Sequence, residues 1–222
     1  MTSIDQTATR RQAALPFGRT PLPDLEFALA RETVAHFKPP ELRRRLSAML
    51  VLARGAGASA DDLRYVAGTD VSLVPHSGTW VEIRRPGHDR QVPVLAKFSD
   101  ELRQLARQAR TGPLLGDRDQ PLPLPAFAPG HLLEQLVARL CQHRPGSLIT
   151  IERLRRAWLV EHLNGALPLR EFLTVTGERS LQAVHELADF CSPPDMDAVR
   201  ISRFMGAVSD AEVFDLSAWG LD

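Results

Sequence analysis

The chain has 222 residues, of which 44% are hydrophobic and 24% charged, proportions that are ordinary for a soluble globular protein. The 27 lysines and arginines balance the 27 aspartates and glutamates, and this zero net charge argues against strong nonspecific binding to DNA. Because no apolar segment approaches the roughly 18 residues of a membrane span, and the polar N-terminal segment contains no signal peptide, the sequence predicts a cytoplasmic protein.

The N-terminal part of the sequence predicts an arm followed by helices. Residues 1–23 are polar and contain three prolines, which is typical of a flexible arm. Hydrophobic periodicity predicts helices over residues 25–37 and from residue 41 to the glycines at 55 and 57. Ser59 and Asp62 resemble a capping box, so a further helix is expected to run to about Val66.

The central part of the sequence changes period and then returns to helices. Residues 71–74, 80–83 and 91–94 read as three short strands separated by turn residues. A helix is expected around residues 98–106, and the loop over 111–130, rich in proline and glycine, is read as a surface excursion or a hinge. Further helices are predicted over 131–142, 151–163, 168–175 and 180–190. The predicted fold class is therefore mainly α with a small three-stranded antiparallel sheet (α+β).

Charge is distributed unevenly along the chain. Residues 170–222 carry four arginines against ten acidic residues, and the preceding part carries 23 basic against 17 acidic residues. We predict one domain over residues 24–192, followed by an acidic C-terminal tail over 193–222 with one short docking helix. The histidines and the two cysteines have no metal-ligand spacing, so neither a metal site nor a cofactor is predicted.

Four short strings occur in an order and at spacings that resemble the catalytic domain of the tyrosine recombinases, the phage-integrase family. They are the turn Gly57–Leu63 followed by Asp70-Val71, Arg90-Gln91-Val92-Pro93, Glu152-Arg153-Leu154-Arg155-Arg156, and Val175-Thr176-Gly177-Glu178. The resemblance covers roughly residues 25–192 and implies the fold of that catalytic domain.

The resemblance also implies which chemistry this chain lacks. Members of the family cut DNA with a tyrosine nucleophile, two arginines that bind the phosphate, a lysine that protonates the leaving oxygen, and histidines. Only the second arginine is retained, as Arg155. The other family positions are degenerate and hold Ser59 (first arginine), Arg85 (lysine), Glu152 and Glu178 (histidines) and Leu187 (nucleophile). Because the chain has one tyrosine, Tyr65, in another part of the fold, we predict no enzymatic activity.

Two functional hypotheses follow from this resemblance. In the first, the chain is a catalytically inactive integrase-like protein linked to DNA recombination or integration, and it binds double-stranded DNA through phosphate contacts from Arg155, Arg85, Arg156 and Arg90. Residues 1–40 are too few for the helical domain that completes the family's DNA clamp, which weakens this hypothesis. In the second, the chain is a protein–protein interaction module that keeps the integrase fold without DNA binding, and residues 195–222 mediate self-association or contact a partner.

Both hypotheses predict that Ser59, Arg85, Arg155 and Glu178 converge on one concave surface. An unrelated mixed α/β domain, the third interpretation, would scatter these residues. For Arg155 the simpler interpretation is a surface arginine or one in a salt bridge with Glu152 or Glu161. For the other arginines it is a solvated side chain whose charge is offset by Glu82, Asp89 and Glu152. The basic run at residues 43–45 is expected to point outward from its helix.

Overall fold

The computed structural model describes residues 20–143, 148–165, 168–178 and 181–192. In these ranges it contains seven α-helices and one three-stranded antiparallel sheet, which confirms the predicted fold class. Contacts divide the chain into two compact units, Met1–Cys191 and Ser192–Asp222, and the fold below is that of the first unit. The segment 195–222, predicted to dock onto a partner, and the helix expected within it lie outside the described residues.

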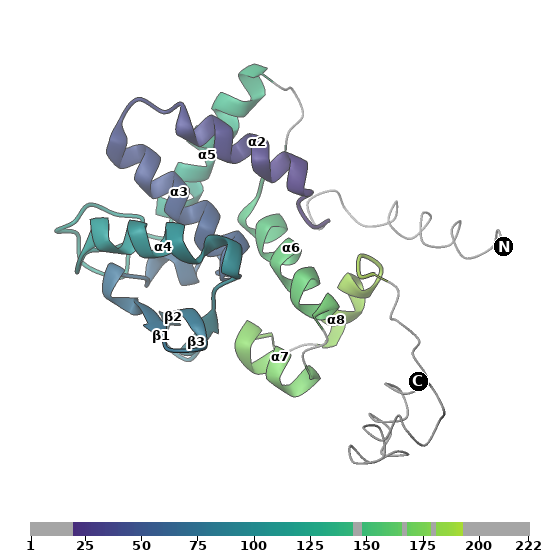
Figure 1. Ribbon diagram of the computed structural model, residues 1–222. Coiled ribbons are helices and arrows are strands. Elements are labelled where there is room, and N and C mark those ends of the chain that lie inside the picture. Colours follow the sequence, from purple (N-terminus) through teal and green to yellow (C-terminus); the bar gives the residue numbers. More distant parts are fainter. Residues whose placement is uncertain (1–19, 144–147, 166–167, 179–180, 193–222) are drawn as a thin grey trace, which may run out of the picture. The chain divides into compact units, whose positions relative to one another are not determined.

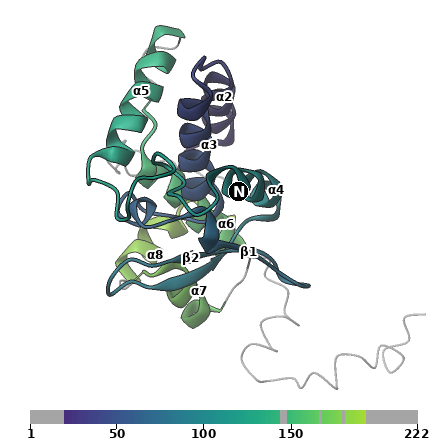
Figure 2. The ribbon, with the colours of Figure 1, turned by 90° about the vertical axis from the view of Figure 1, so that its left-hand side faces the viewer.

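Helix α3 (Pro40–Gly55) is the centre of the helical part. It contacts α2 (Asp24–Ala35), α4 (Ala96–Ala109), α5 (Ala128–His143) and α6 (Ile151–Asn164) (Figures 1 and 2). Every residue from Ala48 to Gly55 is buried, because neighbouring helices cover this half of α3 on all sides. The predicted boundaries of α2, α3 and α6 agree with the structure to within two residues.

The sheet has the strand order β1 (Val71–Val74), β2 (Gly78–Ile83) and β3 (Arg90–Pro93). Val81 of β2 lies opposite Val71 on one side and Val92 on the other. Val81, Ile83 and Val92 belong to the hydrophobic core, α4 contacts β1 and β2, and α7 (Leu169–Thr176) contacts β3. The three strands were predicted to within two residues, and side-chain burial alternates at the strand period in β2.

The prediction of a helix from Ser59 to about Val66 is wrong. The structure has only a short 3-10 turn, η2 (Asp62–Arg64), followed by a second one, η3 (Gly68–Asp70). The backbone between them pairs instead with the proline-rich loop: Leu114 donates to the carbonyl of Val66 and Gly68 donates to that of Gly112. These long-range hydrogen bonds take the backbone groups that a continuing helix would need.

The loop predicted over residues 111–130 is only in part a surface excursion, because residues 117–119, 121–123 and 125–127 are exposed but other residues of the loop are buried. Leu114, Leu115 and Leu124 are buried in the core. Arg44 is also buried and donates to the carbonyls of Leu114 and Gly116, both at 2.8 Å. The expectation that the whole basic run points outward is therefore wrong for Arg44, which binds the loop to α3.

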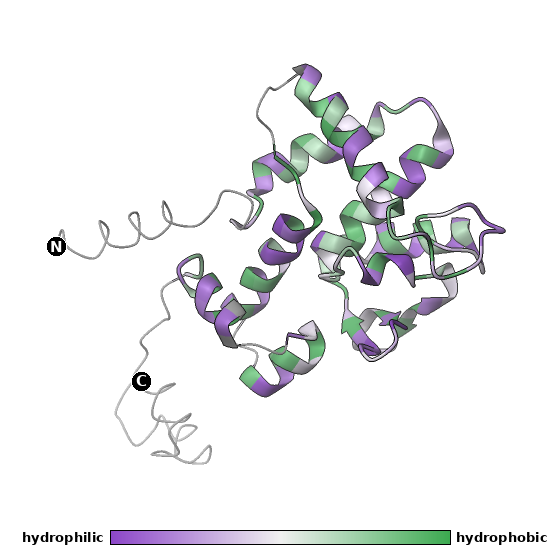
Figure 3. Cartoon of the chain, turned by 180° about the vertical axis from the view of Figure 1, so that it is seen from behind, coloured by the Kyte–Doolittle hydropathy of each residue, from purple (hydrophilic) through white to green (hydrophobic). Residues whose placement is uncertain are grey.

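Hydropathy along the helices agrees with this packing. Most helices carry both hydrophobic and hydrophilic residues (Figure 3). Trp158 of α6 is fully buried, whereas Trp80 of β2 is half-buried. The last described helix is α8 (Leu181–Ala188), which contacts α6. None of the described helices is both long and apolar enough to cross a bilayer.

Candidate functional site

The turn that follows α3 depends on one glycine and one pair of side chains. Gly57 has a φ of +59°, and a Cβ atom there would lie 2.2 Å from the Trp158 ring, so only glycine fits. The Ser59 N–H donates to the Asp62 carboxylate (2.9 Å), and the Asp62 N–H donates to the Ser59 hydroxyl (3.2 Å). This confirms the predicted capping pair and leaves the Ser59 hydroxyl occupied as an acceptor.

Asp62 is a buried carboxylate with two arginine partners. Arg90 contacts both carboxylate oxygens, at 2.7 and 3.3 Å, and Arg85 lies 3.6 Å from one of them and 3.2 Å from Asp61. Burial raises the pKa of Asp62, but the hydrogen bonds and charge of Arg90, together with hydrogen bonds from Ser59, outweigh burial and leave the pKa below its usual value. Asp62 therefore stays ionised and holds both arginines.

Arg155 is engaged entirely by its own chain. Its side chain is 9% exposed, and Nη2 donates to the Glu178 carboxylate and to the Thr176 carbonyl, both at 2.8 Å. Nη1 donates to the carbonyl of Gly57. The partner of Arg155 is thus neither Glu152 nor Glu161 but Glu178. These contacts join α6 to the end of α7 and to the turn after α3.

The structure brings the predicted site residues together. Gly177 lies against Arg90, since a Cβ atom at Gly177 would lie 3.2 Å from the arginine side chain. Ser59, Arg85, Arg155 and Glu178 therefore lie in one connected group, as predicted, and the interpretation as an unrelated domain with scattered residues is wrong. That this group lines a concave surface stays a prediction. We call this group the arginine–carboxylate cluster; its charged members are Asp61, Asp62, Arg85, Arg90, Arg155 and Glu178.

Arg156, the remaining arginine predicted to contact phosphate, and its neighbour Arg153 have other partners. Arg156 pairs with Glu152 of its own helix and with Glu186 of α8, both at 2.9 Å. Arg153 is buried on another side of α6, where it donates to the Thr20 carbonyl (3.1 Å). The segment that contains Thr20 packs against α6 at this point, because Leu22 is buried and its N–H donates to the Arg153 carbonyl.

The predicted nucleophile position lies in α8. Leu187 is 1% exposed and belongs to the hydrophobic core. Tyr65, the only tyrosine of the chain, follows η2 and is half-buried, with the Arg64 guanidinium 5.7 Å from its ring centre. Leu187 carries no hydroxyl group. Among the described residues, no group of histidine, cysteine or acidic side chains could hold a metal ion.

Two charged centres were missed by sequence reasoning. Asp62 was read only as a capping residue, although it also pairs with Arg90, 28 positions away. Glu161 of α6 accepts from Arg54 (2.7 Å) and Lys97 (2.9 Å), and it therefore links α6 to α3 and α4. A local motif signals the cap but carries no information about partners that only the tertiary fold supplies.

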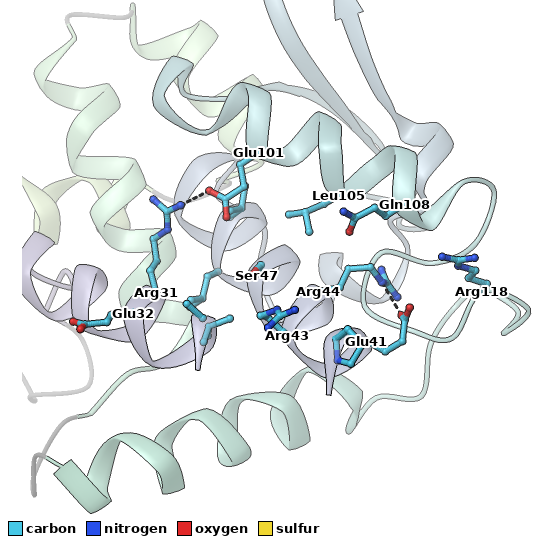
Figure 4. Close-up of a pocket in the computed structure, with 15 residues that line it drawn as sticks. Arg31, Glu32, Glu41, Arg43, Arg44, Ser47, Glu101, Leu105, Gln108 and Arg118 are labelled. Carbon is cyan, nitrogen blue, oxygen red and sulfur yellow. Dashed lines mark hydrogen bonds and ion pairs between the residues drawn. The ribbon is translucent and has the colours of Figure 1, made fainter. Parts of the chain in front are cut away.

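A separate pocket of about 660 Å³ lies between α2, α3 and α4 (Figure 4). Two of its arginines are paired inside it, Arg31 with Glu101 and Arg44 with Glu41. The hydrogen bond and charge of Arg44 hold the pKa of Glu41 below its usual value. No member of the arginine–carboxylate cluster lines this pocket, so it is not the predicted site.

Comparison with known proteins gives a match in structure but none in sequence. No protein-family model matches the chain, and no curated protein is similar to it in sequence. Among solved structures, XerA recombinase is 14% identical, with a TM-score of 0.56 over 88% of this chain and 65% of that one. XerH site-specific recombinase, bound to a palindromic difH substrate, is 14% identical, with a TM-score of 0.57 over 85% of this chain and 53% of that one.

A lambda integrase dimer bound to a core site is 16% identical, with a TM-score of 0.54 over 88% of this chain and 68% of that one. The chain thus spans between about half and two thirds of the length of these recombinases. At such identities the similarity concerns the fold. Two features of the structure agree with this similarity: the order of helices, three-stranded sheet and helices, and the cluster where the family motifs meet. This chain therefore has the fold of a tyrosine recombinase catalytic domain.

Proposed function

We propose that this protein is a non-cleaving recombinase-fold protein that acts in DNA recombination through contacts with another protein. One observation carries the proposal: each of the four arginines predicted to contact phosphate pairs with a carboxylate of the same chain. Arg85 and Arg90 pair with Asp62, Arg155 pairs with Glu178, and Arg156 pairs with Glu152 and Glu186.

A DNA phosphate would have to displace these carboxylates. Glu178 is close enough to Arg155 for a charge-assisted hydrogen bond, and its negative charge repels an approaching phosphate. Two backbone carbonyls also accept from the same guanidinium, and they would lose a partner in a buried place if Arg155 turned toward DNA. The cluster therefore favours an internally neutralised core over a phosphate-binding site.

The chain lacks the side chains that are central to cleavage of a DNA strand. Leu187 supplies no nucleophile, and Arg85 is a poor proton donor because a guanidinium keeps its proton far above neutral pH. Binding energy elsewhere cannot replace a missing nucleophile. The placement in recombination is inferred from the fold, since the XerH and lambda integrase structures contain DNA and this chain shares their catalytic-domain fold.

The experiment compares DNA binding by wild type and two matched variants, Arg85→Gln and Arg139→Gln. Arg85 is the more exposed of the two arginines held by Asp62, and Arg139 is an exposed residue of α5, so both changes remove one charge. We expect the two variants to bind a duplex of about 20 base pairs as weakly as wild type over a range of salt concentrations.

A nicked duplex that traps covalent protein–DNA adducts tests cleavage in the same samples, and we expect none. Salt-dependent duplex binding that Arg85→Gln alone reduces would refute the proposal and support the DNA-binding hypothesis. A covalent adduct would refute the loss of cleavage directly.

A further inference from the structure

A second group of arginines lies at the C-terminal half of α4, apart from the arginine–carboxylate cluster. Arg103 and Arg107 are four positions apart and lie on one face of α4, and Arg110, with a φ of +56°, is the residue that follows the helix as its C-cap. With Val71 and Leu73 of β1 they line a groove of about 470 Å³. The other residues that line this α4–β1 groove are Gly68, Thr69, Ala106 and Thr111.

The α4–β1 groove is basic and holds no acidic side chain. Arg107 and Arg110 are exposed, and within the described residues neither has a carboxylate partner at ion-pair distance. Arg103 pairs only with Asp100, whose side chain is 98% exposed, so solvent screens that ion pair. The groove therefore presents three cations to an incoming ligand, whereas the cluster around Arg155 presents almost none.

The strand beside these arginines is an open edge. Among the described strands, β1 pairs only with β2, so its outer backbone groups have no strand partner. Leu73 is 57% exposed, and its neighbour Val74 is also exposed. Proteins usually protect such an apolar edge strand with charged side chains, proline or a covering segment, since it offers a template for another strand.

We propose that the α4–β1 groove binds an extended acidic segment of a partner protein. The segment adds to the edge of β1, places acidic side chains on Arg107 and Arg110, and covers Leu73 with an apolar side chain. This inference rests on the proposed function, because it names the surface and the chemistry of the protein partner. A nucleic acid fits less well: no aromatic residue lines the groove for base stacking, and phosphates would leave Leu73 uncovered.

The test uses the full chain and a labelled, end-blocked peptide of about eight residues that alternates glutamate and valine. The variant Arg107→Gln/Arg110→Asn removes the two unpaired charges; asparagine is chosen because residue 110 has a φ of +56°. Leu73→Thr removes the apolar contact and keeps a strand former. The control is Arg139→Gln, an exposed helical arginine on α5, outside the groove.

Fluorescence anisotropy should show salt-dependent peptide binding that the double variant weakens about tenfold or more, that Leu73→Thr also weakens, and that Arg139→Gln leaves unchanged. A peptide with glutamine in place of glutamate should bind as poorly as the double variant. Absence of peptide binding, or an equal loss in the control, overturns this inference.

A duplex or single-stranded oligonucleotide that binds more tightly than the peptide and loses affinity in the double variant also overturns it, because the groove is then a nucleic-acid site. The proposed function fails separately, through DNA binding that depends on Arg85 or through a covalent adduct, so the two failures can be distinguished.

Discussion

The arginine–carboxylate cluster and the α4–β1 groove hold the same kind of side chain in opposite states. In the cluster, Arg155 is buried, Arg90 is partly buried, and both are paired and connect segments that lie far apart in the sequence. In the groove, Arg107 and Arg110 are exposed and unpaired among the described residues. An arginine that is paired within its own fold contributes to stability, whereas we propose that one left unpaired at a surface contributes to binding. Position in a family motif does not decide between these roles.

The largest expected loss of stability comes from a change at Gly57, which lies in the turn that Arg155 contacts. Gly57→Ala should destabilise the protein by about 4 kcal/mol or more, because a Cβ atom would overlap the Trp158 ring and residue 57 has a positive φ. Gly87→Ala is the control: residue 87 also has a positive φ, but no atom lies within 4 Å of its Cβ position, so only about 1 kcal/mol should be lost. Urea unfolding followed by circular dichroism measures both, and equal losses would contradict the packing argument.

Arg155 tests the difference between a paired and an unpaired arginine directly. Arg155→Met should cost about 3 kcal/mol, because Glu178 and the carbonyls of Gly57 and Thr176 lose their donor in a mostly buried place. Arg107→Gln, on the exposed face of α4, should change the free energy of unfolding by less than about 0.5 kcal/mol. Similar losses in the two variants would remove the distinction between the two regions.

Glu178→Gln probes whether the cluster can be opened. The variant keeps a hydrogen-bond acceptor but removes the charge that neutralises Arg155, so we expect a loss of about 1 kcal/mol in stability. Binding of duplex DNA at low salt should rise relative to wild type, since the competing carboxylate charge is gone. A mobility-shift titration checks this, with Glu134→Gln, a change at an exposed residue of α5, as the charge-matched control. An equal rise in both variants would show only the change in net charge.

The smallest expected effect is a pH dependence near the cluster. His162 of α6 packs edge to face against Trp158, with ring centres 4.4 Å apart. Burial lowers the pKa of His162 below 6.5, the charge of Glu161 opposes this shift, and the charge of Arg54 adds to it. As the pH falls below 6.5, the unfolded chain takes up a proton before the folded chain does. Stability is therefore complete above the unfolded pKa and declines toward the folded one.

His162→Phe keeps a ring against Trp158 and removes this titration. Between about pH 7.5 and pH 5, the melting temperature of the variant should fall less than that of wild type. The slopes are compared by differential scanning calorimetry. Identical slopes would contradict a lowered pKa at His162.

The sequence by itself determined the elements and predicts which chemistry is missing. Hydrophobic periodicity is a local property, so it located α2, α3, α6 and the three strands to within two residues. The prediction that no nucleophile is present rests on the resemblance, which aligns Leu187 with the family's tyrosine, and on Tyr65 being the one tyrosine of the chain. Four short strings also predicted that Ser59, Arg85, Arg155 and Glu178 converge. Each of these conclusions needs only neighbouring residues or fixed spacings.

Only the tertiary structure decided what the charged residues do. Nothing in the sequence distinguishes Arg44 and Arg155 from an exposed helical arginine such as Arg107. Both are nevertheless buried, because their guanidinium groups donate to carbonyls of a distant loop and a distant turn. In the part of the chain that the structure describes, Arg107 has no carboxylate partner, because no acidic side chain lines the groove beside it. The energy of a charge depends on its burial and on the partners within a few ångströms, and the sequence specifies those only through the completed fold.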